Sequence, residues 1–218
     1  CKLCYYASHA DKIPEEKRYK FLQYIVARAN KGGNVTIEPH GQENIPKEGG
    51  FMLFPNHQGL YDVLAIVDVC PRPLSAVIKK EAAGVPFLKQ CVAIMKAFSI
   101  DREDIRQSMQ VISNVTKEVQ SGRNYIIFAE GTRSKMGNKL LDFKGGSFKA
   151  ATKAKCPIVP VALIDSFKPF DTSSIEPVTV QVHFLKPMLY DEYKDMKTVE
   201  IAAEVKHRIE ETIEKYEK

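Results

Sequence analysis

Residues 51–62 read Phe-Met-Leu-Phe-Pro-Asn-His-Gln-Gly-Leu-Tyr-Asp, an apolar run that changes abruptly into polar and turn-forming residues. The run Phe51 to Phe54 has the length of a buried strand, and Pro55 ends it because proline cannot donate to a sheet. A turn follows, and apolar residues then recur at helical spacing, at Leu60, Val63, Leu64 and Val67. The pattern predicts a buried strand, a tight turn and a helix.

His57 and Asp62 are the candidate catalytic residues of this stretch. On a regular helix, residues five apart point about 140° away from each other. The two side chains can therefore meet only if His57 lies in the turn and folds back over the first turn of the helix. A histidine whose one ring nitrogen is held by a carboxylate has a fixed tautomer and suits a general base. The alternative is a turn histidine that merely caps the helix.

The composition is that of an ordinary globular protein with a mild excess of positive charge. The chain has 218 residues and a net charge of +5, and this length suits one α/β domain. The charge favours an anionic partner, such as a phosphate ester, a nucleotide-bearing cofactor or an anionic membrane surface. The basic residues are spread along the chain, which does not indicate a nucleic-acid partner.

The cysteines are five in number and scattered along the chain. This favours a reducing compartment over a disulfide framework. Cys1 and Cys4 have the spacing of metal ligands, but no second pair completes a site, so no metal is expected. No run approaches the roughly 18 apolar residues of a membrane-spanning helix. Because the chain begins at Cys1 without an initiator methionine, we expect a longer protein, with a hydrophobic anchor upstream.

Predicted strands alternate with predicted helices along the chain. Strands are expected at 35–38, 51–54, 74–78, 125–128, 157–163 and 178–184, and the clearest helices at 14–30, 104–120 and 198–217. The apolar segment 81–98 is expected either in the core or along a slot for a long-chain substrate. This alternation predicts an α/β fold: a single domain with a mostly buried mixed sheet flanked by helices.

The segment 1–33 is expected to precede an α/β domain at 34–218. Within it, residues 14–30 form an amphipathic helix whose apolar stripe is Phe21, Leu22, Ile25, Val26 and Ala29, surrounded by Lys and Arg. Two interpretations stay open. The helix packs on its own domain, or it lies on an anionic membrane surface.

Further polar clusters follow other predicted strands and apolar runs. Glu130 to Ser134 follow the strand at 125–128, and Asp101-Arg102 follow an apolar run. Sites in open α/β sheets gather beyond the carboxyl ends of strands, and the arginine fork matches phosphate. Lys144, beside Gly145 and Gly146, adds charge next to bare backbone N–H groups. The alternatives are an ordinary ion pair for each arginine and a helix-entry turn for the glycines.

The clusters occur in an order that resembles the glycerolipid acyltransferase family, specifically the 1-acyl-glycerol-3-phosphate acyltransferases. Its blocks are matched by Asn56-His57 through Asp62, Phe98-Ser99-Ile100-Asp101-Arg102, Phe128-Ala129-Glu130-Gly131-Thr132-Arg133-Ser134 and Pro157-Ile158-Val159-Pro160-Val161, with Lys144-Gly145 between the last two. The resemblance covers roughly residues 35 to 190. Ala129 replaces the usual proline, and Ser99 replaces a usually apolar residue.

The resemblance implies transfer of a fatty acyl group from an acyl thioester to the sn-2 hydroxyl of lysophosphatidic acid, which gives phosphatidic acid. The donor would be acyl-CoA or an acyl-carrier protein, with no other cofactor. His57 would be the general base and Asp62 would orient it, and transfer would be direct. Alternative acceptors are glycerol-3-phosphate or another lysophospholipid. A non-catalytic binder of anionic lipids is a further alternative, which the His57–Asp62 pair disfavours.

The resemblance also implies a binding site for the acceptor's phosphate, formed by Arg102, Glu130, Gly131, Thr132, Arg133 and Lys144. An ionised Glu130 would repel phosphate, so we expect it to orient Arg133 or a glycerol hydroxyl. The helix beginning near Gln58 would present free N–H groups to the oxyanion. Because the substrates are lipids, the enzyme is expected at a membrane surface, on its cytoplasmic face.

Overall fold

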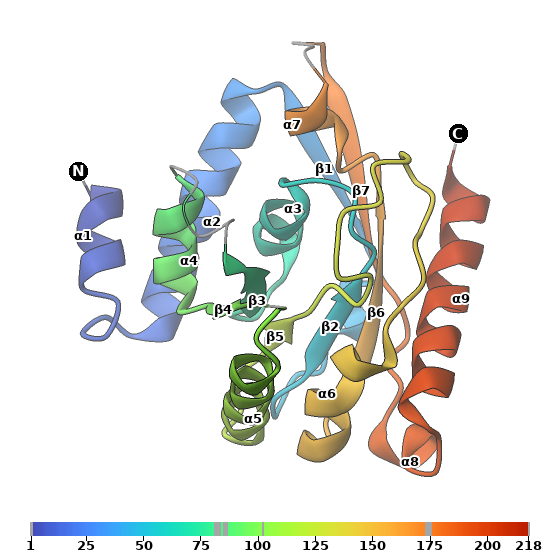
Figure 1. The fold of residues 1–218 in the computed structure, drawn as a ribbon. Helices are drawn as coiled ribbons and strands as arrows, with labels where there is room; N and C mark the ends of the chain where they lie inside the picture. Colours follow the sequence, from blue (N-terminus) through green and yellow to red (C-terminus); the bar gives the residue numbers. More distant parts are fainter. Residues whose placement is uncertain (1, 81–83, 85–86, 102, 173–175, 218) are drawn as a thin grey trace.

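A seven-stranded sheet runs through the computed structural model, which describes residues 2–80, 84, 87–101, 103–172 and 176–217 (Figure 1). The strand order is β1-β7-β6-β2-β5-β3-β4. The strands are β1 Val35–His40, β2 Met52–Pro55, β3 Ser75–Lys79, β4 Phe98–Ile100, β5 Tyr125–Ile126, β6 Ile158–Ile164 and β7 Val178–Phe184. All neighbours are parallel except β6 and β7. The predicted mixed sheet is confirmed.

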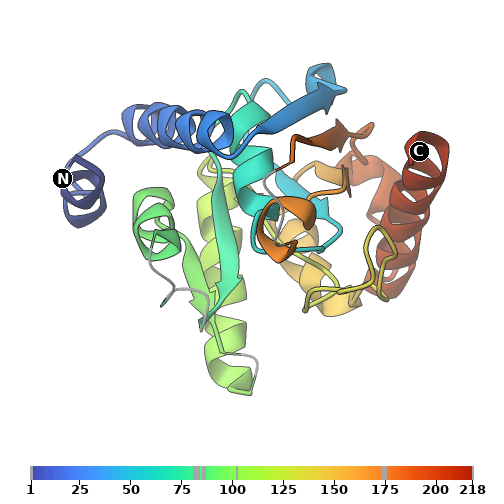
Figure 2. The same cartoon turned by 90° about the horizontal axis from the view of Figure 1, so that it is seen from above.

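Helices cover both faces of this sheet. They are α1 Lys2–Ser8, α2 Glu15–Gly32, α3 Asp62–Val69, α4 Leu88–Met95, α5 Ile105–Gln120, α6 Lys149–Ala154, α7 Lys168–Asp171, α8 Tyr190–Tyr193 and α9 Thr198–Tyr216, with short 3-10 turns η1 Gln42–Asn44 and η3 Gly145–Phe148. Figure 2 shows α2 and α9 on opposite sides of the molecule. Within the described residues, no helix is both long and apolar enough to cross a membrane.

The alternation of side chains along β2 divides the core into two layers. Leu53, with Phe51 just before the strand, packs with α2, α3 and α4, whereas Met52 and Phe54 pack with α5, α6 and α9. All four side chains are completely buried. Successive side chains on a strand point to opposite faces, so a run that is apolar throughout belongs in the middle of a sheet covered on both sides. The expectation of a buried strand before Pro55 is therefore confirmed.

The amphipathic helix α2 packs on its own domain. Its stripe residues Phe21, Leu22 and Val26 lie in the same core layer as α3 and α4. The Tyr19 hydroxyl also donates toward the carbonyls at the end of α3. Of the two interpretations of the stripe, the structure supports packing, because most of the apolar face that would lie on a membrane is covered; only Ala29 of the stripe is exposed.

The helix predicted from Asp104 onward is the long helix α5. The Asp104 side chain accepts a hydrogen bond from the Gln107 N–H, which satisfies one of the free N–H groups at the helix start. The chain leaves α5 through Gly122, whose φ of +99° suits glycine alone among common residues. This helix lies beside β4 and α6 and places its Ile112 toward the interior between them.

Candidate active site

The turn between β2 and α3 holds His57 outside the helix, as the sequence predicted. Asn56 anchors the turn to β6, since its amide nitrogen donates to the Leu163 carbonyl at 3.0 Å and its oxygen accepts from the Leu163 N–H at 2.7 Å. The helix α3 begins only at Asp62. His57 therefore folds back over the first turn of α3, and its Nδ1 lies 2.7 Å from Asp62 Oδ2.

Asp62 is fully buried and is surrounded by hydrogen-bond donors. Besides His57, it accepts from the N–H of Gln58 at 2.7 Å, the N–H of Gly59 at 3.1 Å and the hydroxyl of Ser166 at 2.6 Å. Such a set of donors suits an ionised carboxylate, so we assign the proton of the neutral imidazole to His57 Nδ1. The other ring nitrogen, Nε2, is then an acceptor and can act as a base. The ring is steadied by stacking on Phe128, with centroids 4.1 Å apart.

The backbone N–H groups expected to stabilise an oxyanion are used differently. Gln58 and Gly59 both donate to the Asp62 carboxylate, because the helix starts at Asp62 and its carboxylate reaches back over the turn. That expectation is therefore wrong. These N–H groups hold the Asp62 carboxylate in place beside His57.

Glu130 is also buried, and it holds the backbone of the catalytic turn. Its Oε1 accepts from the His57 N–H at 2.6 Å, and its Oε2 accepts from the Leu141 N–H at 2.9 Å. Burial raises the pKa of this carboxyl above its ordinary value, and the two N–H groups partly oppose that shift. Glu130 thus positions His57, in place of the expected orientation of Arg133 or a glycerol hydroxyl.

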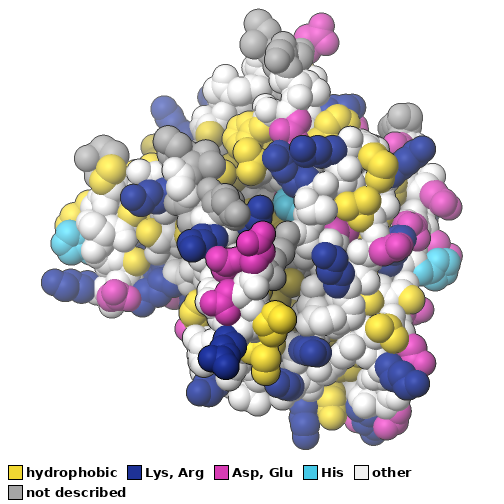
Figure 3. Space-filling model, in the orientation of Figure 1, with side chains coloured by type: hydrophobic (Ala, Val, Ile, Leu, Met, Phe, Trp, Pro, Cys, Tyr) yellow, Lys and Arg dark blue, Asp and Glu magenta, His cyan; other side chains and the backbone are white. Residues whose placement is uncertain are grey.

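An apolar cavity of about 430 Å³ opens beside His57. Its walls come from α3, α4, α5 and β3, with Phe128 and the η3 turn completing them. The apolar lining residues include Val63, Leu64, Ala76, Ile78, Leu88, Cys91, Val92, Met95, Ala97, Ile100 and Ile112. Figure 3 shows a hollow near the middle of this face, with Lys and Arg side chains around it. The described part of segment 81–98 therefore lines a slot, as one of its two interpretations predicted.

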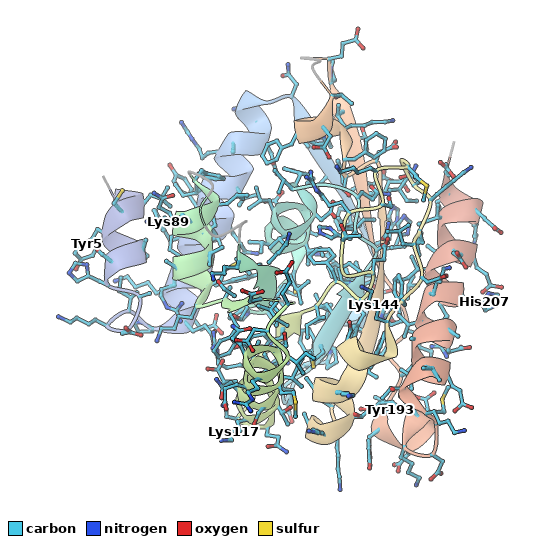
Figure 4. All side chains as sticks on the ribbon, viewed as in Figure 1. Tyr5, Lys89, Lys117, Lys144, Tyr193 and His207 are labelled. Atoms are coloured by element: carbon cyan, nitrogen blue, oxygen red, sulfur yellow. The ribbon has the colours of Figure 1, made fainter. Side chains whose placement is uncertain are left out.

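Two of the predicted binding residues, Gly131 and Lys144, line this same cavity with His57. The Lys144 side chain lies over Gly131, since an added Cβ there would be 3.0 Å from its Nζ. Figure 4 labels Lys144 near the middle of the view. Gly131 has a φ of +79°, and this left-handed conformation favours glycine. Lys144 and Lys79 therefore bring positive charge to a mostly apolar cavity that His57 also lines.

Arg133 lies in a different place, in a groove of about 460 Å³ beside the same turn. The groove is lined by Gln58, Arg133, Lys135, Gly137, Phe167, Asp171 and Thr172. Arg133 Nη1 faces Asp171 Oδ1 at 3.4 Å. Thr132, which lies between Gly131 and Arg133 in the sequence, is exposed. Arg102 lies outside the described residues. The residues expected to form one phosphate site thus lie in two places, Gly131 and Lys144 in the cavity and Arg133 in the groove.

The side chains of Ser166 and Gln58 belong to the hydrogen-bond network around the candidate site, and the sequence reasoning missed both. Ser166 is completely buried, and Gln58 joins it to the loop residue Asn138 through hydrogen bonds of 2.8 and 2.7 Å. Ser166 follows β6, as His57 follows β2 and Glu130 follows β5, so its place beyond the carboxyl end of a strand was the available signal. Among the described residues, no group of three or more potential metal ligands is present.

Comparisons with known proteins point to one family. The sequence model of the acyltransferase family matches residues 36–164. The 1-acyl-sn-glycerol-3-phosphate acyltransferase of Helicobacter pylori is 32% identical over 138 residues, which cover 61% of this chain and 58% of that protein. The Escherichia coli protein of the same name is 30% identical over 171 residues, covering 78% of this chain and 69% of that protein.

The fold has a close counterpart among solved structures. The 1-acyl-sn-glycerophosphate (LPA) acyltransferase PlsC from Thermotoga maritima superposes with a TM-score of 0.78 and 20% identity, covering 98% of this chain and 88% of that one. That identity supports a shared fold only, whereas the family match covers more than half of the chain. The chain belongs to the acyltransferase family.

Proposed function

We propose that this protein transfers a fatty acyl group from an acyl thioester to the sn-2 hydroxyl of lysophosphatidic acid, forming phosphatidic acid. The observation that carries this proposal is the His57–Asp62 pair, joined at 2.7 Å, beside an apolar cavity. A buried carboxylate fixes the histidine as a base, and the cavity offers apolar surface to a long acyl chain. The names of the relatives support the choice of acceptor.

His57 Nε2 takes the proton of the acceptor hydroxyl while the hydroxyl oxygen attacks the thioester carbonyl carbon. The tetrahedral intermediate then expels the thiolate, which takes that proton from the imidazolium. Asp62 stabilises the imidazolium during this sequence. Cys91 lies in the cavity wall, but burial raises the pKa of its thiol to about 12, so it stays protonated and is a poor nucleophile. This supports direct transfer to the acceptor.

The charged residues of both pockets bind the phosphate groups of the substrates. Lys144 stands in the cavity with His57, and Arg133 and Lys135 stand in the groove. Glycerol-3-phosphate or a lysophospholipid with a larger head group would use the same cations. The acceptor that saturates the enzyme at the lowest concentration therefore distinguishes these possibilities.

The test is to incubate the protein with lysophosphatidic acid and either a long-chain acyl-CoA or an acyl-carrier protein, and to measure phosphatidic acid by mass spectrometry. We expect product from the wild type and at most a trace from His57→Ala. Glycerol-3-phosphate and lysophosphatidylcholine serve as competing acceptors. A wild type that makes no phosphatidic acid with either donor, or a fully active His57→Ala protein, contradicts the proposal.

The enzyme works at the cytoplasmic face of a membrane, because its acceptor and product are lipids. The thiols of Cys70, Cys91 and Cys156 support a reducing compartment. Since the stripe of α2 is covered, contact with lipid requires other surfaces of the protein. Flotation with vesicles containing phosphatidic acid tests this part of the proposal, and protein that stays at the bottom of the gradient contradicts it.

A further inference from the structure

The groove beside the catalytic turn contains a negative charge among its positive ones. Arg133 and Lys135 face it together with Asp171, the last residue of α7. Only one contact of 3.4 Å joins the arginine and the carboxylate, and each side chain is about one third exposed, at 31% and 35%. The fork of an arginine can bind a carboxylate or a phosphate through two parallel hydrogen bonds. The guanidinium of Arg133 is therefore held loosely by this partner.

Asp171 also touches the catalytic turn itself. A Cβ added to Gly59 would lie 3.0 Å from Asp171 Oδ2 and 3.1 Å from the Cα of Phe167. The Asp171 N–H donates to the Phe167 carbonyl at 2.9 Å, so the two residues that approach Gly59 belong to one helical turn. The carboxylate thus stands between Arg133 and the backbone two residues after His57. A phosphate that binds Arg133 from the groove must approach this carboxylate.

We propose that Asp171 is a specificity-determining residue that competes with the acceptor's phosphate for Arg133. This inference rests on the proposed function, because it assigns the Arg133 groove to the phosphate monoester of the acceptor. A phosphate monoester carries up to two negative charges and makes bidentate bonds to arginine, so it displaces a single-contact carboxylate. The competition lowers the affinity of the groove for phosphate. It thereby favours release of phosphatidic acid, which keeps the same phosphate as the acceptor.

The competition predicts that removing the negative charge tightens binding. An exposed ion pair of this kind is weak, so we expect Asp171→Asn to lower the KM for lysophosphatidic acid by about three- to tenfold. Inhibition by phosphatidic acid should strengthen by a similar factor. If Asp171 instead held Arg133 in its productive position, the same substitution would raise the KM.

The experiment measures kcat and KM for acceptor and donor separately in the wild type, Asp171→Asn and Asp171→Glu. Asp191→Asn is the matched control, because Asp191 is an exposed carboxylate that pairs with Lys194 in α8. We expect a lower acceptor KM in Asp171→Asn alone, and no such effect when Arg133→Ala is already present. An unchanged or raised acceptor KM overturns the inference. A lowered KM for acyl-CoA alone overturns it too, since the groove would then bind the donor's phosphates.

Binding of glycerol-3-phosphate, measured by calorimetry, separates this inference from the proposed function. We expect Asp171→Asn to bind glycerol-3-phosphate more tightly than the wild type, whether or not turnover occurs. If the wild type makes no phosphatidic acid but this tightening is seen, the proposed reaction fails and the competition stands. If the wild type is active and no tightening is seen, the competition fails and the reaction stands.

Discussion

The cavity and the groove share one turn of the chain but differ in what they present to a ligand. His57 and Gly59 line the cavity, whereas Gln58 between them lines the groove. The cavity is lined mostly by apolar side chains, with two lysines, Lys79 and Lys144, whereas three of the groove's seven lining residues, Arg133, Lys135 and Asp171, are charged. Apolar walls discriminate weakly between chains that differ by one methylene, but charged groups discriminate strongly between phosphates and neutral groups. Under the proposed function, the cavity therefore takes the acyl chain and the groove takes a phosphate.

The largest effect is expected at the turn that both pockets share. His57→Ala should lower kcat by about 10³-fold or more, because it removes the base, while both KM values change little. Steady-state kinetics on both substrates measure this, with thermal unfolding as the check on folding. A large rise in either KM with kcat retained would contradict this prediction, because it would show that His57 binds a substrate and does not act as the base.

A smaller loss of kcat is expected at Ser166, whose hydroxyl contacts Asp62. Ser166→Ala removes the hydroxyl that donates to Asp62 at 2.6 Å. We expect a fall of about 10-fold in kcat, comparable with the loss of outer-shell partners of ligands in other sites. Unfolding stability should drop by about 1–3 kcal/mol, since a buried acceptor loses its donor. Ser166→Cys, which keeps a weak donor, is the matched variant. Full activity in Ser166→Ala would show that the backbone N–H groups hold Asp62 unaided.

A change in the cavity wall should alter chain-length preference. Val92 lies on α4 and lines the cavity, so Val92→Phe fills part of it. We expect kcat/KM for long acyl donors to fall by about 10-fold or more, with short donors little affected, because a long chain no longer fits without displacing packed side chains. Activity across a series of acyl-CoA lengths measures this.

The groove supplies the control for that experiment. Arg133→Ala should raise the KM for lysophosphatidic acid by about 10-fold and leave the chain-length profile unchanged, because it removes a charge-assisted contact and no apolar wall. If Val92→Phe changed acceptor affinity as strongly as Arg133→Ala does, the two pockets would be one continuous site and the comparison would fail.

The smallest effect on activity is expected away from both pockets, at His183 on β7. This side chain is buried and stacks on His40 at 4.2 Å, and burial, with the charge of His40, lowers its pKa to about 4. The unfolded chain takes up this proton near pH 6.5, so the fold loses stability as the pH falls from about 6.5 to about 4, by at most about 3 kcal/mol. Urea unfolding across this range should show a smaller loss in His183→Phe, with activity at pH 7 unchanged. An equal acid loss in both proteins would contradict the assignment.

The strand β2, the turn at His57 and the helix α3 were predictable from sequence, whereas the loop that carries Arg133 and Lys144 was only partly predictable. Phe51 to Phe54, Pro55 and the following helical spacing predict the strand, the turn and α3 because each has a strong local signal. Whether the N–H groups of Gln58 and Gly59 are free depends on where α3 begins. Because it begins at Asp62, the carboxylate accepts from these N–H groups, and helix boundaries are the least certain part of such a prediction.

Arg133 and Lys144 belong to a loop without periodicity, so nothing in the sequence says which way each side chain points. Lys144 turns toward His57 because its N–H is held by the Ala129 carbonyl at 2.9 Å and its side chain crosses Gly131. Arg133 turns to Asp171, a residue 38 positions later that no short-range pattern connects to it. The sequence predicted one corner for these cations, but tertiary contacts place Lys144 in the cavity and Arg133 in the groove.

Four groups meet on the carboxylate of Asp62: the ring of His57, the N–H groups of Gln58 and Gly59, and the hydroxyl of Ser166, which follows β6. One carboxylate therefore both orients His57 and holds the surrounding backbone together. Natural variants that change the reaction must therefore keep Asp62. Replacing it would remove both the hydrogen bond that ties the start of α3 to the end of β6 and the carboxylate partner of His57. The amide protons of Gln58 and Gly59 should accordingly be among the slowest in the turn to exchange with deuterium.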